Sequence, residues 1–200
     1  MPRTKQGCEP MRNAAKKKIE AAALPMFAKK GFSISVNEIA AAAGVSKGLL
    51  YRYYPSKEAL IVELTRQIIV ISEQSMKAVA ETDESAVIKI KRVTAMMCEM
   101  FSGNHMGIDY FMFMAQVGMS GFPVKELVYD VYNLSNPIDN LARIISEGQA
   151  EGCVINGAPE QLAMTYWATV QGLCCYVLMN MPLLPTPETL LRVLLKEKFI

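Results

Sequence analysis

Lysines, tyrosines and an arginine crowd into one short stretch, GVSKGLLYRYYPSKEAL, at residues 44–60. Lys47 and Lys57 each follow a serine that can cap a helix, so both lysines fall in the first turn of a predicted helix. That turn favours acidic side chains, yet its free backbone N–H groups and a nearby ammonium group together suit a phosphate. Tyrosine hydroxyls also donate to phosphates, and an arginine can form two hydrogen bonds with guanine. The stretch therefore predicts contact with nucleic acid.

Helical spacing divides this stretch into two faces. Leu50 and Tyr54 are four residues apart and are predicted to point into a core, whereas Lys47 and Tyr51 share a different face. Gly48 lowers helix stability by roughly 1 kcal/mol relative to alanine, but it lets the backbone approach a partner closely. An alternative interpretation is a solvated lysine surface over tyrosines that pack a small three-helix core.

A short glycine-containing turn, AGVS, joins this helix to the helix before it. The earlier helix is predicted to begin at Ser35, which forms a capping box with Glu38, and to stop at the glycine of the turn. The later helix opens at Ser46 and ends at Tyr54, because the residue before a proline avoids helical geometry. Two short helices joined in this way are typical of a helix-turn-helix, whose second helix enters the DNA major groove.

The rest of the chain also predicts helices, and no sheet, because no alternating run of β-branched residues is bounded by turns. A first helix covers about 11–30, with Pro25 as a kink rather than a break and Gly31 at its end. Ser56 caps a long fourth helix that leaves the first module. The remaining helices are predicted at 85–103, 105–120, 123–151 with a kink at Pro137, 159–180 and 187–198. The prediction is an all-α protein of about nine helices.

Charge is distributed unevenly along a chain of 200 residues whose net charge is only +2. Residues 1–57 hold eleven basic and three acidic side chains, for a charge of +8, while residues 58–200 hold ten basic and sixteen acidic ones, for −6. At 52% hydrophobic residues, the chain can bury one or two real cores. The pattern indicates a basic, polyanion-binding module in front of a separate body, although a solvated lysine face would give the same charges.

Metal, redox and catalytic chemistry have little support in the sequence. The five cysteines, at 8, 98, 153, 174 and 175, form no CxxC pair, and His105 is the single histidine and is predicted to lie in a turn. The thiols are interpreted as small apolar core residues in a reducing, cytoplasmic compartment, and no signal peptide is apparent. Since the GxSxG, HExxH, P-loop and GxGxxG patterns are also absent, we expect no enzyme, no metal and no cofactor.

One segment is long enough to be considered as a membrane span. Residues 161–187 carry no charge, but they include Thr165, Gln171 and Asn180, and no basic flank would set an orientation. We therefore predict a buried or oligomer-forming helix and no membrane association.

The segment FAKKGFSISVNEIAAAAGVSKGLLYRYYPSKEAL, residues 27–60, resembles the DNA-binding region of the tetracycline-repressor (TetR/AcrR) family. The shared motifs are FxxxGF at the end of the first helix, SVxxIA at the start of the second, AGVSKG into the third and LYRYYPSK into the fourth. The resemblance covers about 12–72, and the rest agrees only in length, helical content and helix order. Pro25, Leu49 and Tyr54 depart from the usual residues, and Leu49 and Arg52 leave the operator sequence beyond inference.

The resemblance implies a helix-turn-helix DNA-binding domain over 12–72, with the motif at 35–54, and an effector-binding and dimerisation domain over 73–200. It implies a homodimer that binds a palindromic double-stranded DNA operator, most often as a repressor, and is released by a small molecule. The residues expected at the DNA are Ser35, Ser46, Lys47, Gly48, Leu49, Tyr51, Arg52, Tyr53 and Lys57, with Lys47, Tyr53 and Lys57 at phosphates. The alternative function is a small-molecule-binding or scaffold protein whose DNA module is vestigial.

The C-terminal part offers candidates for the dimer interface and for an apolar effector. The uncharged segment 161–187 and the sequence ETLLRVLLKEKF after it predict a large apolar surface on the eighth and ninth helices, as an obligate interface would need. Residues 96–119 are rich in methionine and aromatic side chains, which suit an adaptable apolar pocket but are equally typical of a core. The candidate effector residues are Phe101, Tyr110, Met114, Tyr132, Trp167 and Gln171.

Overall fold

The computed structural model describes residues 5–102, 105–121, 137–179 and 184–200. In these ranges the chain forms nine α-helices and no strand, and its one β-bridge joins Val154 to Leu195. The helices are α1 (Lys5–Lys30), α2 (Val36–Ala42), α3 (Lys47–Tyr53), α4 (Lys57–Ala80), α5 (Ala86–Ser102), α6 (His105–Met119), α9 (Pro137–Ala150), α10 (Pro159–Leu178) and α11 (Pro187–Leu191). The prediction of an all-α fold is confirmed.

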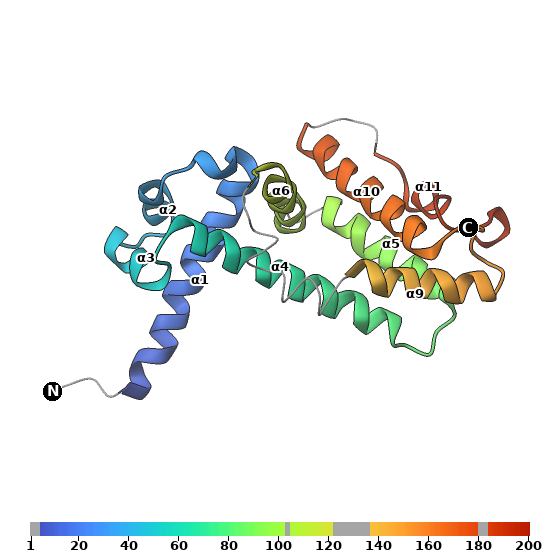
Figure 1. The fold of residues 1–200 in the computed structure, drawn as a ribbon, viewed down its shortest axis with the longest axis horizontal. Helices are drawn as coiled ribbons and strands as arrows, with labels where there is room; N and C mark the ends of the chain where they lie inside the picture. The colour runs from blue at the N-terminus through green and yellow to red at the C-terminus, as the bar shows by residue number, and fades with distance from the viewer. Residues whose placement is uncertain (1–4, 103–104, 122–136, 180–183) are drawn as a thin grey trace.

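The molecule is elongated, with the N-terminal helices at one end and the C-terminal helices at the other (Figure 1). Helices α1, α2 and α3 form the first group, and α5, α9, α10 and α11 form the second. Helix α4 runs from the first group to the second, and α6 lies between them. Helices α4 and α6 therefore each pack against both groups.

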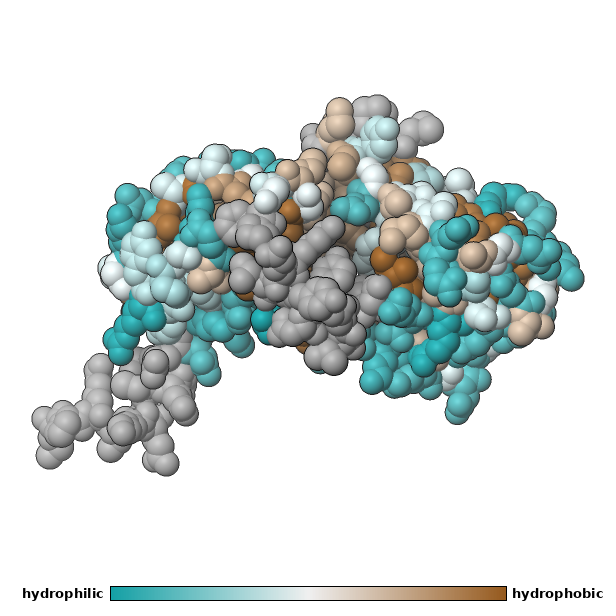
Figure 2. All heavy atoms as spheres, viewed as in Figure 1, coloured by the Kyte–Doolittle hydropathy of each residue, from teal (hydrophilic) through white to brown (hydrophobic). Residues whose placement is uncertain are grey.

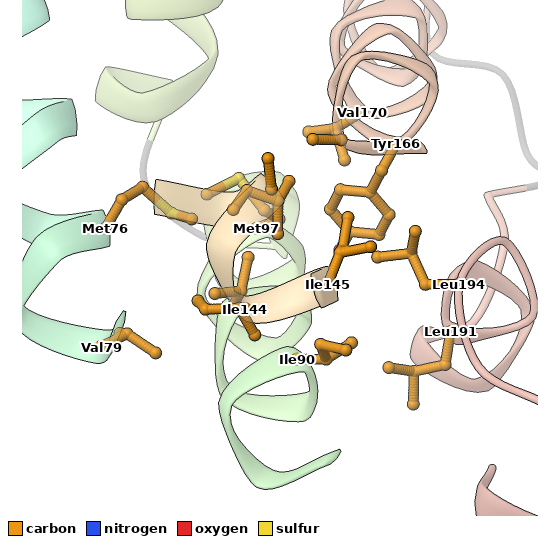
Figure 3. Packing of buried hydrophobic residues seen from close by; sticks show 14 of the residues in the cluster. Met76, Val79, Ile90, Met97, Ile144, Ile145, Tyr166, Val170, Leu191 and Leu194 are labelled. Carbon is orange, nitrogen blue, oxygen red and sulfur yellow. The ribbon is translucent and has the colours of Figure 1, made fainter. Parts of the chain in front are cut away.

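The larger hydrophobic core lies among α4, α5, α6, α9, α10 and α11. Figure 3 shows apolar side chains of α4, α5, α9, α10 and α11, with Leu194 just after α11, gathered around Ile144, Ile145 and Tyr166. The Tyr166 hydroxyl lies 2.8 Å from the hydroxyl of Thr94, so that this polar atom is satisfied inside the core. Each fully buried side chain of this size contributes roughly 1.5–3 kcal/mol, which is the main stabilisation of the C-terminal group.

A second core lies under α1, α2 and α3, and α6 takes part in it. Phe113 of α6 is fully buried there, with its ring centroid 6.1 Å from that of Phe27 and 5.7 Å from that of Phe32. Leu50 of α3 and Leu60 of α4 are fully buried in the same cluster. The α6 helix is therefore packed into the core that supports α3.

The last predicted helix is wrong in extent. Helix α11 ends at Leu191 and does not continue to residue 198. The chain turns instead so that the Ile155 N–H donates to the Leu194 carbonyl and the Lys196 N–H donates to the Cys153 carbonyl, both at 2.9 Å. The leucine spacing fits a helix, but pairing with residues 153–155 buries the same leucines in the chain's own core.

Two other helix boundaries are informative. Helix α1 begins at Lys5, earlier than predicted, and runs unbroken through Pro25 to Lys30. The predicted helix over 123–136 lies outside the described residues, and α9 is described from Pro137 onward. The predicted kink at Pro137 is thus not tested.

The cysteine prediction holds only in part. Cys153 and Cys174 are buried, and burial raises the pKa of the Cys174 thiol to about 12. Cys175 is exposed on α10, which contradicts a core position for it. Within the described ranges, no group of three metal-ligating side chains could hold an ion, and no helix is both long and apolar enough to cross a membrane.

Candidate nucleic-acid interface

The turn between α2 and α3 is fixed by its own backbone. The Val45 N–H donates to the Ala40 carbonyl at 3.0 Å and the Gly44 N–H donates to the Ala41 carbonyl at 3.1 Å, which is a Schellman motif. Gly44 has φ of 64°, a left-handed conformation that strains any residue with a Cβ. This turn sets the angle between the two helices, as the sequence predicts for a helix-turn-helix.

Serine caps start the three helices of this region. Ser35 and Glu38 form the predicted capping box: the Ser35 hydroxyl accepts from the Glu38 N–H at 3.3 Å, and Glu38 accepts from the Ser35 N–H at 2.9 Å. The Ser35 N–H, followed by its hydroxyl, holds the pKa of Glu38 below its ordinary value. Ser46 and Ser56 accept from N–H groups in the first turns of α3 and α4, both at 3.1 Å. Local sequence thus determines where α3 begins.

The buried side of α3 consists of the residues predicted for it. Leu50 is fully buried and Tyr54 is 3% exposed. The Tyr54 hydroxyl donates to the Glu20 carboxylate of α1 at 2.5 Å, and Gln67 of α4 donates to the same oxygen at 2.9 Å. Burial, followed by this hydrogen bond, raises the pKa of Tyr54. The end of α3 is therefore tied to both α1 and α4 through Glu20.

Sequence reasoning missed this Glu20 link, since it joins residues 34 positions apart. The one available signal is Tyr54, which stands where the resembling family usually has phenylalanine. Its extra hydroxyl needs a partner when it is buried.

The opposite side of α3 faces solvent. Lys47, Gly48, Tyr51 and Arg52 are exposed, and the Lys47 Nζ lies 5.9 Å from the centroid of the Tyr51 ring. A Cβ added at Gly48 would meet, beyond its own stretch of helix, no atom of the described residues within 4 Å. No packing contact among the described residues therefore requires glycine at this helical position, although glycine weakens the helix.

Lys57 has partners within the chain, which the sequence did not predict. Its Nζ donates to the carbonyls of Phe32 and Ile34, at 2.5 and 3.2 Å, and its side chain is half-buried. This contact holds the segment before α2 against the start of α4. Leu49 and Tyr53, also predicted for the interface, are half-buried at its edge.

The effector candidates do not gather in one place among the described residues. Tyr110 and Met114 of α6 pack beside the N-terminal core, whereas Trp167 packs in the larger core with its ring 5.6 Å from that of Phe111. Gln171 is half-buried on α10. The Phe101 side chain and all of Tyr132 lie outside the described residues.

Helices α1, α2 and α3 form a small unit in which α3 is capped and has one side open to solvent, and the long helix α4 joins this unit to the second group of helices. This arrangement defines a helix-turn-helix DNA-binding protein. Residues 19–64 match the model of a family described as bacterial regulatory proteins, tetR family. The chain is 32% identical over 160 residues to the HTH-type transcriptional regulator RutR of Escherichia coli O157:H7, covering 80% of this chain and 73% of that protein. The chain belongs to the tetR family and is a DNA-binding transcriptional regulator.

Solved structures share the fold over most of the chain. A putative transcriptional regulator from Saccharomonospora viridis, in complex with choline, superimposes with a TM-score of 0.72 at 18% identity, covering 92% of this chain and 100% of that one. FadR from Bacillus subtilis, in complex with stearoyl-CoA, gives 0.68 at 19% identity, covering 88% and 94%. At these identities the likeness shows the fold alone.

Proposed function

We propose that this regulator is a repressor that binds a palindromic double-stranded DNA operator as a homodimer and leaves it when a small molecule binds. The observation that carries the proposal is the outward face of α3. It combines exposed basic and aromatic side chains with a glycine, Gly48, that the chain's own packing does not require. An open backbone at this point suits close approach to a base edge or a phosphate.

In this arrangement the residues of the interface divide by task. Lys47 and the first turn of α3 hold a phosphate, and Tyr51 donates its hydroxyl to the DNA backbone. In this proposal Arg52 contacts a base edge, and Leu49 contacts a thymine methyl group. Lys57 acts through the protein, because its ammonium group holds the segment before α2 in place.

The second copy is expected to pack on α10. Met164 and Gly172 of α10 and Met179, its C-cap, lie on one side and are exposed, with Met179 68% exposed. Figure 2 shows apolar, tan residues gathered where α10 lies, whereas the lower edge of that end of the molecule is hydrophilic. The predicted ninth helix contributes less than expected, because Leu190 and Leu191 of α11 are buried within their own chain. A two-fold dimer through α10 would present one α3 to each half of a palindrome.

Effector control follows from helices that are shared between the two ends of the molecule. A ligand that binds one conformation better than another shifts the population toward that conformation. Because α6 contributes Phe113 to the core beneath α3, a shift of α6 would alter the spacing of the two α3 helices. Neighbours in fold that hold choline or stearoyl-CoA support a small organic effector. We further propose that the protein acts in the cytoplasm and catalyses no reaction.

Selection of bound fragments from genomic DNA would supply an operator for the test. Tyr51→Ala should weaken binding to that operator at least tenfold, without changing the sedimentation of the protein. Ile88→Ala, at a similarly exposed apolar position on α5, is the matched control and should bind like the wild type. Equal operator affinity of Tyr51→Ala and the wild type would refute the assigned interface.

The alternative, a small-molecule-binding or scaffold protein with a vestigial DNA module, makes a different prediction. Phosphate contacts release counterions, so real DNA binding weakens steeply as salt increases. A plot of log K against log salt with a slope near zero would favour the alternative.

A further inference from the structure

A cavity lies where the two groups of helices meet, between α1, α4 and α6. Its volume is about 740 Å³, and apolar side chains form much of its wall, among them Leu24 and Pro25 of α1 and Ile68 and Ile71 of α4. This volume is in the range of sites for small organic molecules. Among the candidate effector residues, Tyr110 lines it, so the cavity differs from a pocket inside the larger core.

The charges that line this cavity are mainly acidic. Glu20 of α1 and Asp109 of α6 contribute carboxylates, and Asp109 is only 7% exposed. Among the described residues that line the cavity, the basic one is Lys17, which is exposed. The Lys16 Nζ lies 3.6 Å from the Glu20 carboxylate, but it lies closer, at 2.7 Å, to the Glu63 carboxylate. Carboxylates in a partly open cavity with apolar walls and a tyrosine ring favour an organic cation over an anion.

Pro25 adds a neutral acceptor to the same wall. In an unbroken helix the carbonyl of residue 21 accepts from the N–H of residue 25, but proline has no N–H. Ala21 and Pro25 both line the cavity, and α1 is continuous across them. The Ala21 carbonyl therefore lacks its helical donor at a position where a ligand N–H group could supply one.

We infer that this cavity binds an organic cation with an apolar body, such as an alkylammonium group, and that its occupation weakens DNA binding. The coupling runs through Glu20, which lines the cavity and also accepts the hydrogen bond of Tyr54. An ammonium group that pairs with the Glu20 carboxylate would draw it into the cavity and weaken its hydrogen bond with the Tyr54 hydroxyl, which ties the end of α3 to α1. Asp109 is one helical turn from Phe113, so the ligand also contacts the helix that supports the α3 core.

This inference rests on the proposed function for its effect on DNA, but ligand binding can be measured without DNA. Calorimetry on the full chain would compare octylammonium, octanoate and octanol, which share one apolar chain and differ in charge. We expect octylammonium to bind at least tenfold tighter than either of the other two. Glu20→Gln and Asp109→Asn should each reduce that preference at least threefold.

Location is tested by filling the mouth of the cavity. Ala21 is exposed, so Ala21→Phe can block the cavity without disturbing a core, and Ala14→Phe adds the same ring at an exposed position of α1 outside the cavity. Ala21→Phe should abolish octylammonium binding, and Ala14→Phe should leave it unchanged. Saturating octylammonium should also lower the operator affinity of the wild type at least fivefold.

Three results would overturn the inference. If octanol bound as tightly as octylammonium, charge would not determine the ligand. If Ala21→Phe bound octylammonium as the wild type does, the ligand would not lie in this cavity. If octylammonium bound but left the operator affinity unaltered, the proposed coupling between the cavity and α3 through Glu20 would be refuted. If the unliganded protein bound no operator at all, the proposed function would fail, and calorimetry would still decide whether the cavity binds the cation.

Discussion

Gly48→Ala should make the protein more stable and a poorer DNA binder. Beyond its own stretch of helix the new methyl group meets none of the described atoms within 4 Å, and Gly48 lies in α3 without a positive φ. Replacing glycine by alanine in a helix then stabilises the fold by about 0.5–1 kcal/mol. For a chain of this size that gain corresponds to a rise in melting temperature of roughly 1–4 °C.

At the DNA the same methyl group should have the opposite effect. It projects from the exposed face of α3, between the backbone and any phosphate or base edge that approaches Gly48. A cost of about 1 kcal/mol at each half-site is modest for a disturbed base contact. With two half-sites the affinity falls about thirtyfold.

The chain contains its own control for this substitution. Gly118 is also an exposed helical glycine with open space around it, at the far end of α6 from the cavity residues Asp109 and Tyr110. Gly118→Ala should raise stability by a similar or smaller amount and leave operator affinity unchanged. Thermal unfolding and fluorescence anisotropy on the selected operator would measure both quantities. If Gly48→Ala bound the operator as tightly as Gly118→Ala, the assignment of α3 to the DNA would be refuted.

Three further substitutions separate the roles of neighbouring residues, and a fourth tests the dimer. Lys47→Gln should reduce the slope of log K against log salt by about one for each phosphate that the lysine neutralises. Lys57→Gln should leave that slope unchanged and lower the free energy of unfolding, because the Lys57 ammonium group binds backbone carbonyls. Tyr54→Phe removes the hydrogen bond to Glu20 and should cost about 1.5 kcal/mol in a urea titration. Since the pKa of Tyr54 is raised in the fold, its stabilising effect is complete below the ordinary value of 10.0 and declines as pH rises above it, so Tyr54→Phe should be less sensitive to alkali than the wild type. Gly172→Ala on α10 should strengthen the helix but weaken dimerisation in sedimentation equilibrium, and an unchanged dimer constant would exclude Gly172 from the interface.

The elements of the interface could be predicted because their signals are local. Ser35, Ser46 and Ser56 each cap a helix within three residues of themselves, and Gly44 alone provides the left-handed turn. The four-residue spacing of Leu50 and Tyr54 likewise fixes which side of α3 is buried. Such features follow from neighbouring residues and therefore persist in the folded chain.

What the sequence could not provide depends on residues that are distant along the chain. The carbonyls held by Lys57 are 25 and 23 positions away, and Phe113 enters the N-terminal core from α6. The C-terminal leucines show the same limitation, because their spacing fits a helix until contact with residues 153–155 is taken into account. The cavity between α1, α4 and α6 has no sequence signal apart from Pro25, whose missing N–H matters only once α6 is in place.

The central claim is that two copies of this chain read a palindrome with their α3 helices. The most direct measurement is selection of bound sequences from random DNA with the full-length protein, followed by determination of the number of chains per duplex. We predict a palindromic sequence bound by an even number of chains, with affinity that falls steeply as salt increases and is lost in Tyr51→Ala. Recovery of no common sequence, or of one bound by a single chain with no dependence on salt, would contradict the account.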